Sequence, residues 1–219
     1  MKAEVSIFII GDSTAANKTF DKRPESGWGE YLSKHFDDQY LIKNYAVNGR
    51  STKSFRDEGL FEQVEAELRA GDYLIIQFGH NDQKIENPAR YTDPFGAYQN
   101  NITYFVEAAK KKGSIPIVLT SISRRDFVEG QLNTETIGQY PVAALEIAER
   151  LGVQSFDIFK KTQSLLLSEG ESKSKRLFLQ LQPGEHPNYP EGIRDNTHLN
   201  VNGAKVVAKL IAEEIKTII

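Results

Sequence analysis

The chain has 219 residues, of which 39% are hydrophobic and 26% charged; its formal net charge is -3, and it contains no cysteine. This balance is ordinary for a globular protein, and we expect a single domain over residues 1–219. The lack of a basic surplus argues against nucleic acid or an anionic membrane as partner, and the lack of cysteine excludes disulfides, thiolate metal sites and a cysteine nucleophile.

The N-terminal residues do not have the pattern of a signal peptide. Residues 1–4 precede only six mostly apolar residues, too few for the hydrophobic part of a leader. No segment approaches the roughly 20 apolar residues that span a bilayer. We therefore expect a cytoplasmic protein, although a secreted chain without its leader would look the same.

Strand-like and helix-like segments alternate along the chain. Residues 5–10 form a near-continuous apolar run, typical of a strand buried on both faces. Further strands are expected at residues 41–47, 72–78, 115–120 and 153–156, and helices at 27–36, 61–70, 96–112, 141–151, 157–170 and 202–216, the last with Asn202 as its N-cap. This alternation predicts a three-layer α/β/α fold whose five-stranded parallel sheet has the flavodoxin-like order 2-1-3-4-5. Residues 171–194 are polar, contain three prolines, and are expected to form a functional loop.

Polar residues follow several of these strands at what would be one edge of the sheet. Ser13 follows the first strand, Gly49 the second and Asn81 the third, while Asp195 and His198 precede the last helix. Acyl transfer needs a nucleophile, a base, a group that orients the base, and donors for the oxyanion. Ser13, His198 and Asp195 can supply the first three; the N–H groups of Ser13 and Gly49 and the Asn81 amide can supply the donors.

The same residues carry a resemblance to the SGNH (GDSL) hydrolase superfamily. Its four blocks are matched by Gly11-Asp12-Ser13, by Gly49, by Gly79-His80-Asn81-Asp82 and by Asp195-Asn196-Thr197-His198. The third and fourth blocks, together with Gly11-Asp12-Ser13-Thr14-Ala15, are similar to those of rhamnogalacturonan acetylesterases, carbohydrate esterase family 12. The resemblance implies a serine esterase that removes acetyl groups from acetylated rhamnogalacturonan (pectin) oligosaccharides.

It also implies the role of each residue. Ser13 would attack the ester carbonyl, His198 would act as base and then as acid, and Asp195 would fix the imidazole. Ser13, Gly49 and Asn81 would bind the oxyanion. The mechanism requires no metal cofactor, and the four scattered histidines do not have the spacing of a zinc site.

Three further residues are candidates for substrate binding. Arg124 and Arg125, just after the fourth strand, can pair with galacturonate carboxylates or form a solvated loop pair. His80 either contacts substrate or supports Asn81 from behind.

Two other functions remain open on the sequence alone. A lipid esterase or thioesterase would use the same scaffold, but it would want an apolar channel for its acyl chain. A non-catalytic flavodoxin-like binding module would need a phosphate loop, usually richer in glycine than residues 11–17.

Overall fold

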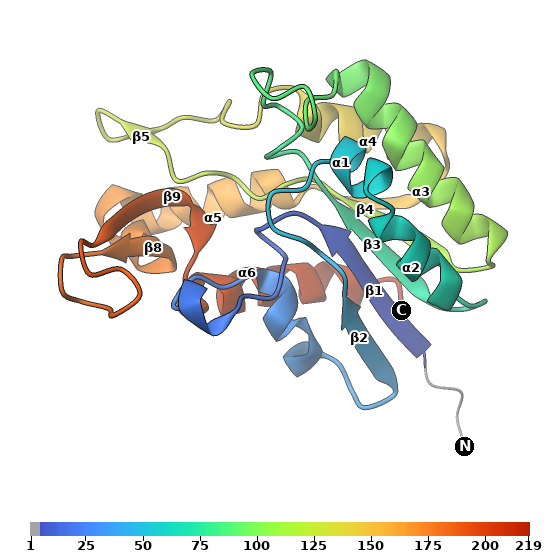
Figure 1. Cartoon of the computed structure of the whole chain (residues 1–219), viewed down its shortest axis with the longest axis horizontal. Helices are drawn as coiled ribbons and strands as arrows, with labels where there is room; N and C mark the ends of the chain where they lie inside the picture. Colours follow the sequence, from blue (N-terminus) through green and yellow to red (C-terminus); the bar gives the residue numbers. More distant parts are fainter. Residues whose placement is uncertain (1–4) are drawn as a thin grey trace.

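A parallel five-stranded sheet forms the centre of the computed structural model, which describes residues 5–219 (Figure 1). Its strands are β1 (Val5–Gly11), β2 (Tyr40–Asn44), β3 (Tyr73–Gln77), β4 (Ile115–Leu119) and β7 (Gln154–Phe156). They lie in the order β2-β1-β3-β4-β7, and every neighbouring pair is parallel. The predicted order of the five strands is therefore confirmed.

Helices cover both faces of this sheet. Aromatic and aliphatic residues on one face pack against α1 (Thr52–Asp57), α2 (Leu60–Glu67), α3 (Gln99–Lys111), which continues the π-helical turn η3 (Pro94–Tyr98), and α4 (Tyr140–Arg150). The other face packs against the 3-10 helix η2 (Trp28–His35), α5 (Ile158–Ser174) and α6 (Val201–Ile215). Two short 3-10 turns complete the helical elements, η1 (Phe20–Lys22) and η4 (Lys175–Leu177). No helix within residues 5–219 is both long and apolar enough to cross a membrane.

The continuous apolar pattern of β1 follows from this layering. Phe8 and Ile10 belong to the core on one side of the sheet, and Ile7 and Ile9 belong to the core on the other. Because successive side chains of a strand point to opposite faces, a strand covered on both sides must be apolar at every position.

Several local predictions were wrong at element boundaries. The helix expected at residues 27–36 is a 3-10 helix, and β2 ends at Asn44, whose side chain accepts the Ala46 N–H at 3.1 Å and turns the chain. The short helix α1 was not expected; Ser51 caps it by accepting the Ser54 N–H at 3.1 Å. At the start of α6, the N-cap is Asn200 rather than Asn202, because the Asn200 side chain accepts the N–H groups of residues 202 and 203.

Much of the segment expected to be a loop, residues 171–194, is ordered secondary structure. Helix α5 reaches Ser174, and β8 (Phe178–Leu181) pairs antiparallel with β9 (Ile193–Leu199). We call this pair the β8–β9 hairpin; it is a two-stranded sheet separate from the central one, and it lies beside α5 (Figure 1). Another small hairpin, β5 (Phe127–Val128) and β6 (Gln131–Leu132), follows β4.

Candidate active site

Ser13 stands in a tight turn directly after β1. A side chain at Gly11 would place its Cβ atom 2.7 Å from the Gln77 carbonyl oxygen, so the last position of the strand needs glycine. Asp12 is fully buried and accepts hydrogen bonds from the Thr14 N–H (2.8 Å) and hydroxyl (2.7 Å). Asp12 therefore braces the turn from inside and leaves Ser13 at the surface of the cleft.

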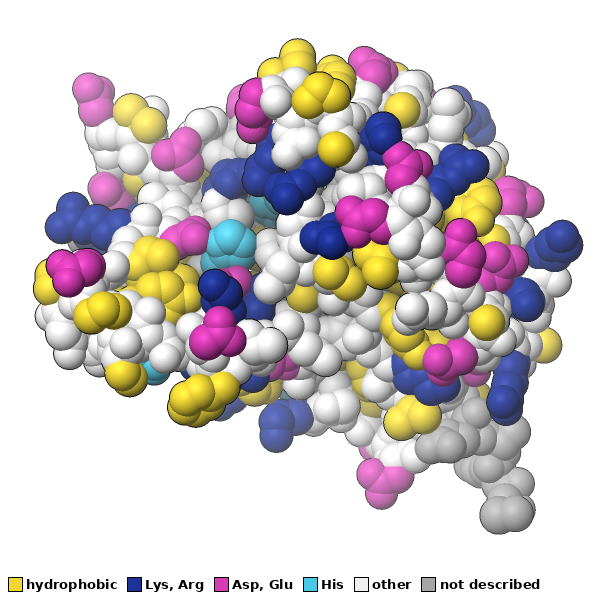
Figure 2. Space-filling model, viewed as in Figure 1, with side chains coloured by type: hydrophobic (Ala, Val, Ile, Leu, Met, Phe, Trp, Pro, Cys, Tyr) yellow, Lys and Arg dark blue, Asp and Glu magenta, His cyan; other side chains and the backbone are white. Residues whose placement is uncertain are grey.

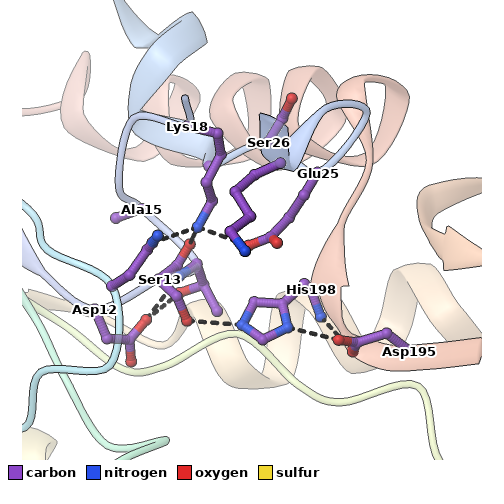
Figure 3. Close-up of polar contacts among 12 residues, drawn as sticks. Asp12, Ser13, Ala15, Lys18, Glu25, Ser26, Asp195 and His198 are labelled. Atoms are coloured by element: carbon purple, nitrogen blue, oxygen red, sulfur yellow. Dashed lines mark hydrogen bonds and ion pairs between the residues drawn. The ribbon is translucent and has the colours of Figure 1, made fainter. Parts of the chain in front are cut away.

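Ser13, His198 and Asp195 form a continuous relay of hydrogen bonds (Figure 3). The Ser13 Oγ atom lies 2.9 Å from His198 Nε2, and His198 Nδ1 lies 2.7 Å from Asp195 Oδ2. The other oxygen of Asp195 accepts the N–H groups of Thr197 (2.7 Å) and His198 (2.9 Å). With Nδ1–H donating to the carboxylate, Nε2 is free to accept the Ser13 proton.

The environment of Asp195 keeps it ionised. Burial by itself would raise its pKa, but the hydrogen bonds and charge of His198, together with the Thr197 N–H, outweigh this and lower the pKa to about 2. Asp195 is therefore an anion at neutral pH, and it can hold the imidazole ring and stabilise an imidazolium.

Arg124 and Arg125 hold the strand segment between the acid and the base. Arg124 Nη1 donates to Thr197 Oγ1 at 2.5 Å, and Arg125 Nη1 donates to Asn196 Oδ1 at 3.0 Å. Arg125 is also buried and donates to the Ser174 hydroxyl. Neither residue is among those that line the cleft containing Ser13; both hold the part of β9 that lies between Asp195 and His198.

The predicted oxyanion donors lie on the same cleft as the relay. Ser13, Gly49, Asn81, Asp195 and His198 all line it. Gly49 has a φ of 74°, a left-handed conformation that favours glycine. The Asn81 amide donates one hydrogen bond to the Arg50 carbonyl at 3.1 Å, which fixes its orientation and leaves its second N–H available.

His80 does not reach this cleft. Its side chain is 3% exposed and its Nδ1 atom lies 3.2 Å from Asp12 Oδ2, so it packs behind the nucleophile turn. Its neighbour Asp82 is fully buried as well and accepts hydrogen bonds from Thr52 and Thr92. Burial raises the pKa of Asp82 to about 7. The placement argues against substrate contact, and the hydrogen-bond partner of His80 is Asp12 rather than Asn81, the residue it was expected to support.

The cleft has a volume of about 400 Å³ and a mostly polar lining. Among residues 5–219, the aliphatic side chains that line it are Leu179 and Ile193, from the β8–β9 hairpin, and Tyr189 adds an aromatic ring. Figure 2 shows basic side chains gathered around a hollow in which a histidine is exposed. Lys84 and Arg90 line the cleft, and neither forms a salt bridge within the described residues.

The sequence analysis missed Lys84 and Arg90 as cleft residues. The available signal was their position in the polar loop that follows Asn81, next to a predicted catalytic block. It also missed Lys18, whose ammonium group lies under the nucleophile turn. Among residues 5–219, no cluster of three or more histidine, aspartate or glutamate side chains is placed to hold a metal ion.

The parallel sheet and the relay at its edge have the arrangement of an ester hydrolase. The chain matches the GDSL-like lipase/acylhydrolase family over residues 9–206, and it belongs to that family. Membership of this family makes it a carboxylic ester hydrolase. The predicted superfamily is confirmed.

Relatives cover almost the whole chain. The chain is 43% identical over 216 residues to the rhamnogalacturonan acetylesterase RhgT of Bacillus subtilis, covering 99% of this chain and 91% of that protein. It is 28% identical to a rhamnogalacturonan acetylesterase of Emericella nidulans, covering 93% of this chain and 81% of the other.

Two solved structures support the fold alone. The acetylxylan esterase Axe2 of Geobacillus stearothermophilus superposes with a TM-score of 0.69 at 18% identity, covering 98% of this chain and 96% of that one. Protein YxiM of Bacillus subtilis superposes with a TM-score of 0.82 at 24% identity, covering 97% of this chain but only 56% of that longer chain.

Proposed function

We propose that this protein is a serine acetylesterase that removes O-acetyl groups from acetylated rhamnogalacturonan oligosaccharides. The observation that carries the proposal is the relay from Ser13 through His198 to Asp195, which opens onto a polar cleft. The names of the full-length relatives support both the acetyl group and the carbohydrate.

The geometry supports a two-step acyl transfer. Ser13 Oγ attacks the acetyl carbonyl carbon while His198 Nε2 takes the hydroxyl proton, and Asp195 stabilises the imidazolium. The N–H groups of Ser13 and Gly49 and the Asn81 amide bind the oxyanion of the tetrahedral intermediate.

The intermediate then collapses to the acyl enzyme. The bond to the sugar oxygen breaks, and His198 returns its proton to that oxygen, so the sugar leaves as an alcohol. Water repeats the sequence on the acetyl-Ser13 ester, which releases acetate and restores the serine.

The lining of the cleft favours a small acyl group on a charged carbohydrate. A long acyl chain would need an apolar channel, whereas the apolar side chains that the described residues bring to the cleft are Leu179, Ile193 and the ring of Tyr189. The cationic side chains of Lys84 and Arg90 suit a substrate that carries carboxylates, as the galacturonate units of pectin do. Both carboxylates that line the cleft already have cationic or imidazole partners, Glu25 with Lys18 and Asp195 with His198.

The test is release of acetate from acetylated rhamnogalacturonan oligosaccharides, compared with acetylated xylan fragments, by wild type and Ser13→Ala. We expect a preference for the rhamnogalacturonan substrate and no turnover by the variant. Undiminished activity of Ser13→Ala would overturn the serine mechanism. Activity that rises from 4-nitrophenyl acetate to the octanoate ester would instead identify a lipid esterase or thioesterase.

A second comparison tests the carbohydrate specificity. Lys84→Met and Arg90→Met should raise KM for the acidic oligosaccharide while leaving turnover of 4-nitrophenyl acetate near the wild-type value, because the small ester carries no carboxylate. If KM for the oligosaccharide is unchanged in both variants, the anionic sugar is not recognised by these side chains.

A further inference from the structure

A buried ammonium group joins three segments of the active site. The Lys18 side chain is completely buried, and its Nζ atom lies 2.6 Å from the Ser13 carbonyl oxygen, 2.6 Å from Asn48 Oδ1 and 2.8 Å from Glu25 Oε1 (Figure 3). An ammonium group has three N–H donors, and here each has its own acceptor.

The three acceptors belong to segments that are far apart in sequence and line one cleft. Ser13 provides the nucleophile, and its own N–H is a proposed oxyanion donor. Asn48 directly precedes Gly49, the second such donor. Glu25 precedes Ser26, whose N–H donates to the Leu199 carbonyl at 2.9 Å, one residue beyond His198.

The buried charge of Lys18 carries a free-energy cost of desolvation. Removing an ammonium group from water costs several kcal/mol, and only close pairing and full hydrogen bonding recover that cost. The Glu25 carboxylate, whose side chain is 12% exposed, makes the pair neutral. Replacement by arginine would not reproduce the arrangement, because a planar guanidinium cannot direct three bonds to acceptors gathered around one atom.

We propose that Lys18 is a positioning residue for ester hydrolysis: its ammonium group locks the nucleophile turn and the Asn48–Gly49 turn in the geometry that stabilises the oxyanion. This inference rests on the proposed function, since it assigns to Lys18 the preorganisation of donors at Ser13 and Gly49. Donors that are fixed before reaction lower the barrier of the chemical step more than they improve substrate binding.

The experiment measures kcat and KM for 4-nitrophenyl acetate in Lys18→Met, Asn48→Ala, Glu25→Gln and the Lys18→Met/Asn48→Ala double variant. Lys43→Met is the control for loss of a lysine ion pair away from the cleft; Lys43 lies 2.9 Å from Glu67 and is more exposed than Lys18. Melting temperature and far-ultraviolet circular dichroism are recorded for each variant.

We expect kcat to fall at least tenfold in Lys18→Met, and up to about 10²-fold, the loss typical of a misplacement near 1 Å. KM should stay within about twofold, and Asn48→Ala should show a smaller loss of the same kind. The double variant should be no slower than Lys18→Met alone, because the Lys18–Asn48 hydrogen bond that Asn48→Ala removes is already absent in Lys18→Met. Lys43→Met should turn over substrate at the wild-type rate.

The inference is overturned if Lys18→Met and Asn48→Ala both keep kcat within twofold of wild type, or if their losses add in the double variant. If Lys18→Met does not fold, the test rests on Asn48→Ala, at an exposed residue, and on Glu25→Gln, which removes only a charge. Unchanged kcat in both variants then overturns the role of Lys18. Ser13→Ala separates the two proposals. Loss of activity there with full activity in the Lys18 and Asn48 variants rejects only the role of Lys18, whereas activity in Ser13→Ala rejects the serine mechanism itself.

Discussion

His80 and Asp12 form a buried pair behind the nucleophile, with Nδ1 of the imidazole 3.2 Å from Oδ2 of the carboxylate. Burial lowers the pKa of His80, although the charge and hydrogen bond of Asp12 oppose the shift. Burial acts to raise the pKa of Asp12, but His80 and Thr14 outweigh it and lower that pKa. The second ring nitrogen of His80 is buried without a hydrogen-bond partner among residues 5–219. At neutral pH the pair is therefore a carboxylate with a neutral imidazole.

This pair makes stability depend on pH. The unfolded chain binds a proton at His80 near pH 6.5, whereas the folded chain binds it only at lower pH. Below pH 6.5 the unfolded state thus holds more protons, and the free energy of unfolding must fall as the pH falls. Urea unfolding of wild type and His80→Gln between pH 5 and 8 measures this, and the variant should have the shallower slope below pH 6.5. If the free energy of unfolding changes with pH equally in wild type and His80→Gln, His80 is not the source of the pH dependence.

Replacing Asn81 by alanine should impair the chemical step. Asn81 lines the cleft, the Arg50 carbonyl accepts one of its amide hydrogens, and we propose that the other binds the oxyanion. Loss of one such donor lowers kcat by about 10²–10³-fold. Kinetics with 4-nitrophenyl acetate check this, with Asn133→Ala, a change in the exposed β6 region, as the control. A kcat within threefold of wild type would remove Asn81 from the oxyanion site.

Asp195→Asn should leave the fold intact and lower kcat by about 10⁴-fold, the usual effect of losing the carboxylate that sets the histidine tautomer. Since the pKa of Asp195 is about 2, the wild-type carboxylate is ionised from pH 5 to pH 9. The loss should therefore be seen at every pH from 5 to 9. A variant that recovers wild-type kcat anywhere in that range would show that the carboxylate is dispensable.

Trp28→Phe should lower the free energy of unfolding by about 2–4 kcal/mol. The Trp28 indole is completely buried and donates to Gln77 Oε1 at 2.9 Å; phenylalanine removes the donor and leaves unfilled volume. Urea unfolding followed by circular dichroism suits this test, because Trp28 is the only tryptophan in the chain. Phe20→Leu, at an aromatic side chain that is 88% exposed, should change stability by less than about 0.5 kcal/mol.

The central sheet and the place of Ser13 at its edge could be predicted because their signals are local. The pairing of Ser13 with His198 and Asp195, which stand on β9, was instead implied by the resemblance of the four sequence blocks. Val5–Gly11 must be apolar throughout to lie between two helical layers, and a serine after such a strand falls at the edge of the sheet. The blocks that contain Gly49 and Asn81 follow the two strands beside β1. Because the carboxyl ends of parallel strands meet at one edge of the sheet, these blocks were expected beside Ser13.

The supporting residues could not be predicted, because their roles depend on segments that meet only in the folded chain. Nothing near Lys18 in the sequence indicates that its ammonium group will meet Asn48 and Glu25. Arg124 reaches Thr197 and Arg125 reaches Asn196 because β9 passes beside them. This strand was not predicted: its first two residues lie in the expected loop 171–194, and the rest were expected only to precede the last helix.

The β8–β9 hairpin makes the hydrogen-bond relay a contact between two separate sheets. The proposed nucleophile follows a strand of the central sheet, whereas the proposed base and acid stand on a separate two-stranded sheet. Buried Phe178 and Leu199 anchor that hairpin in the core, and Arg124, Arg125 and Ser26 form hydrogen bonds to β9. A change that shifts the hairpin relative to the central sheet would alter the distance between His198 and Ser13. The contact between Ser13 and His198 therefore reports how the two sheets pack against one another, because neither sheet fixes it alone.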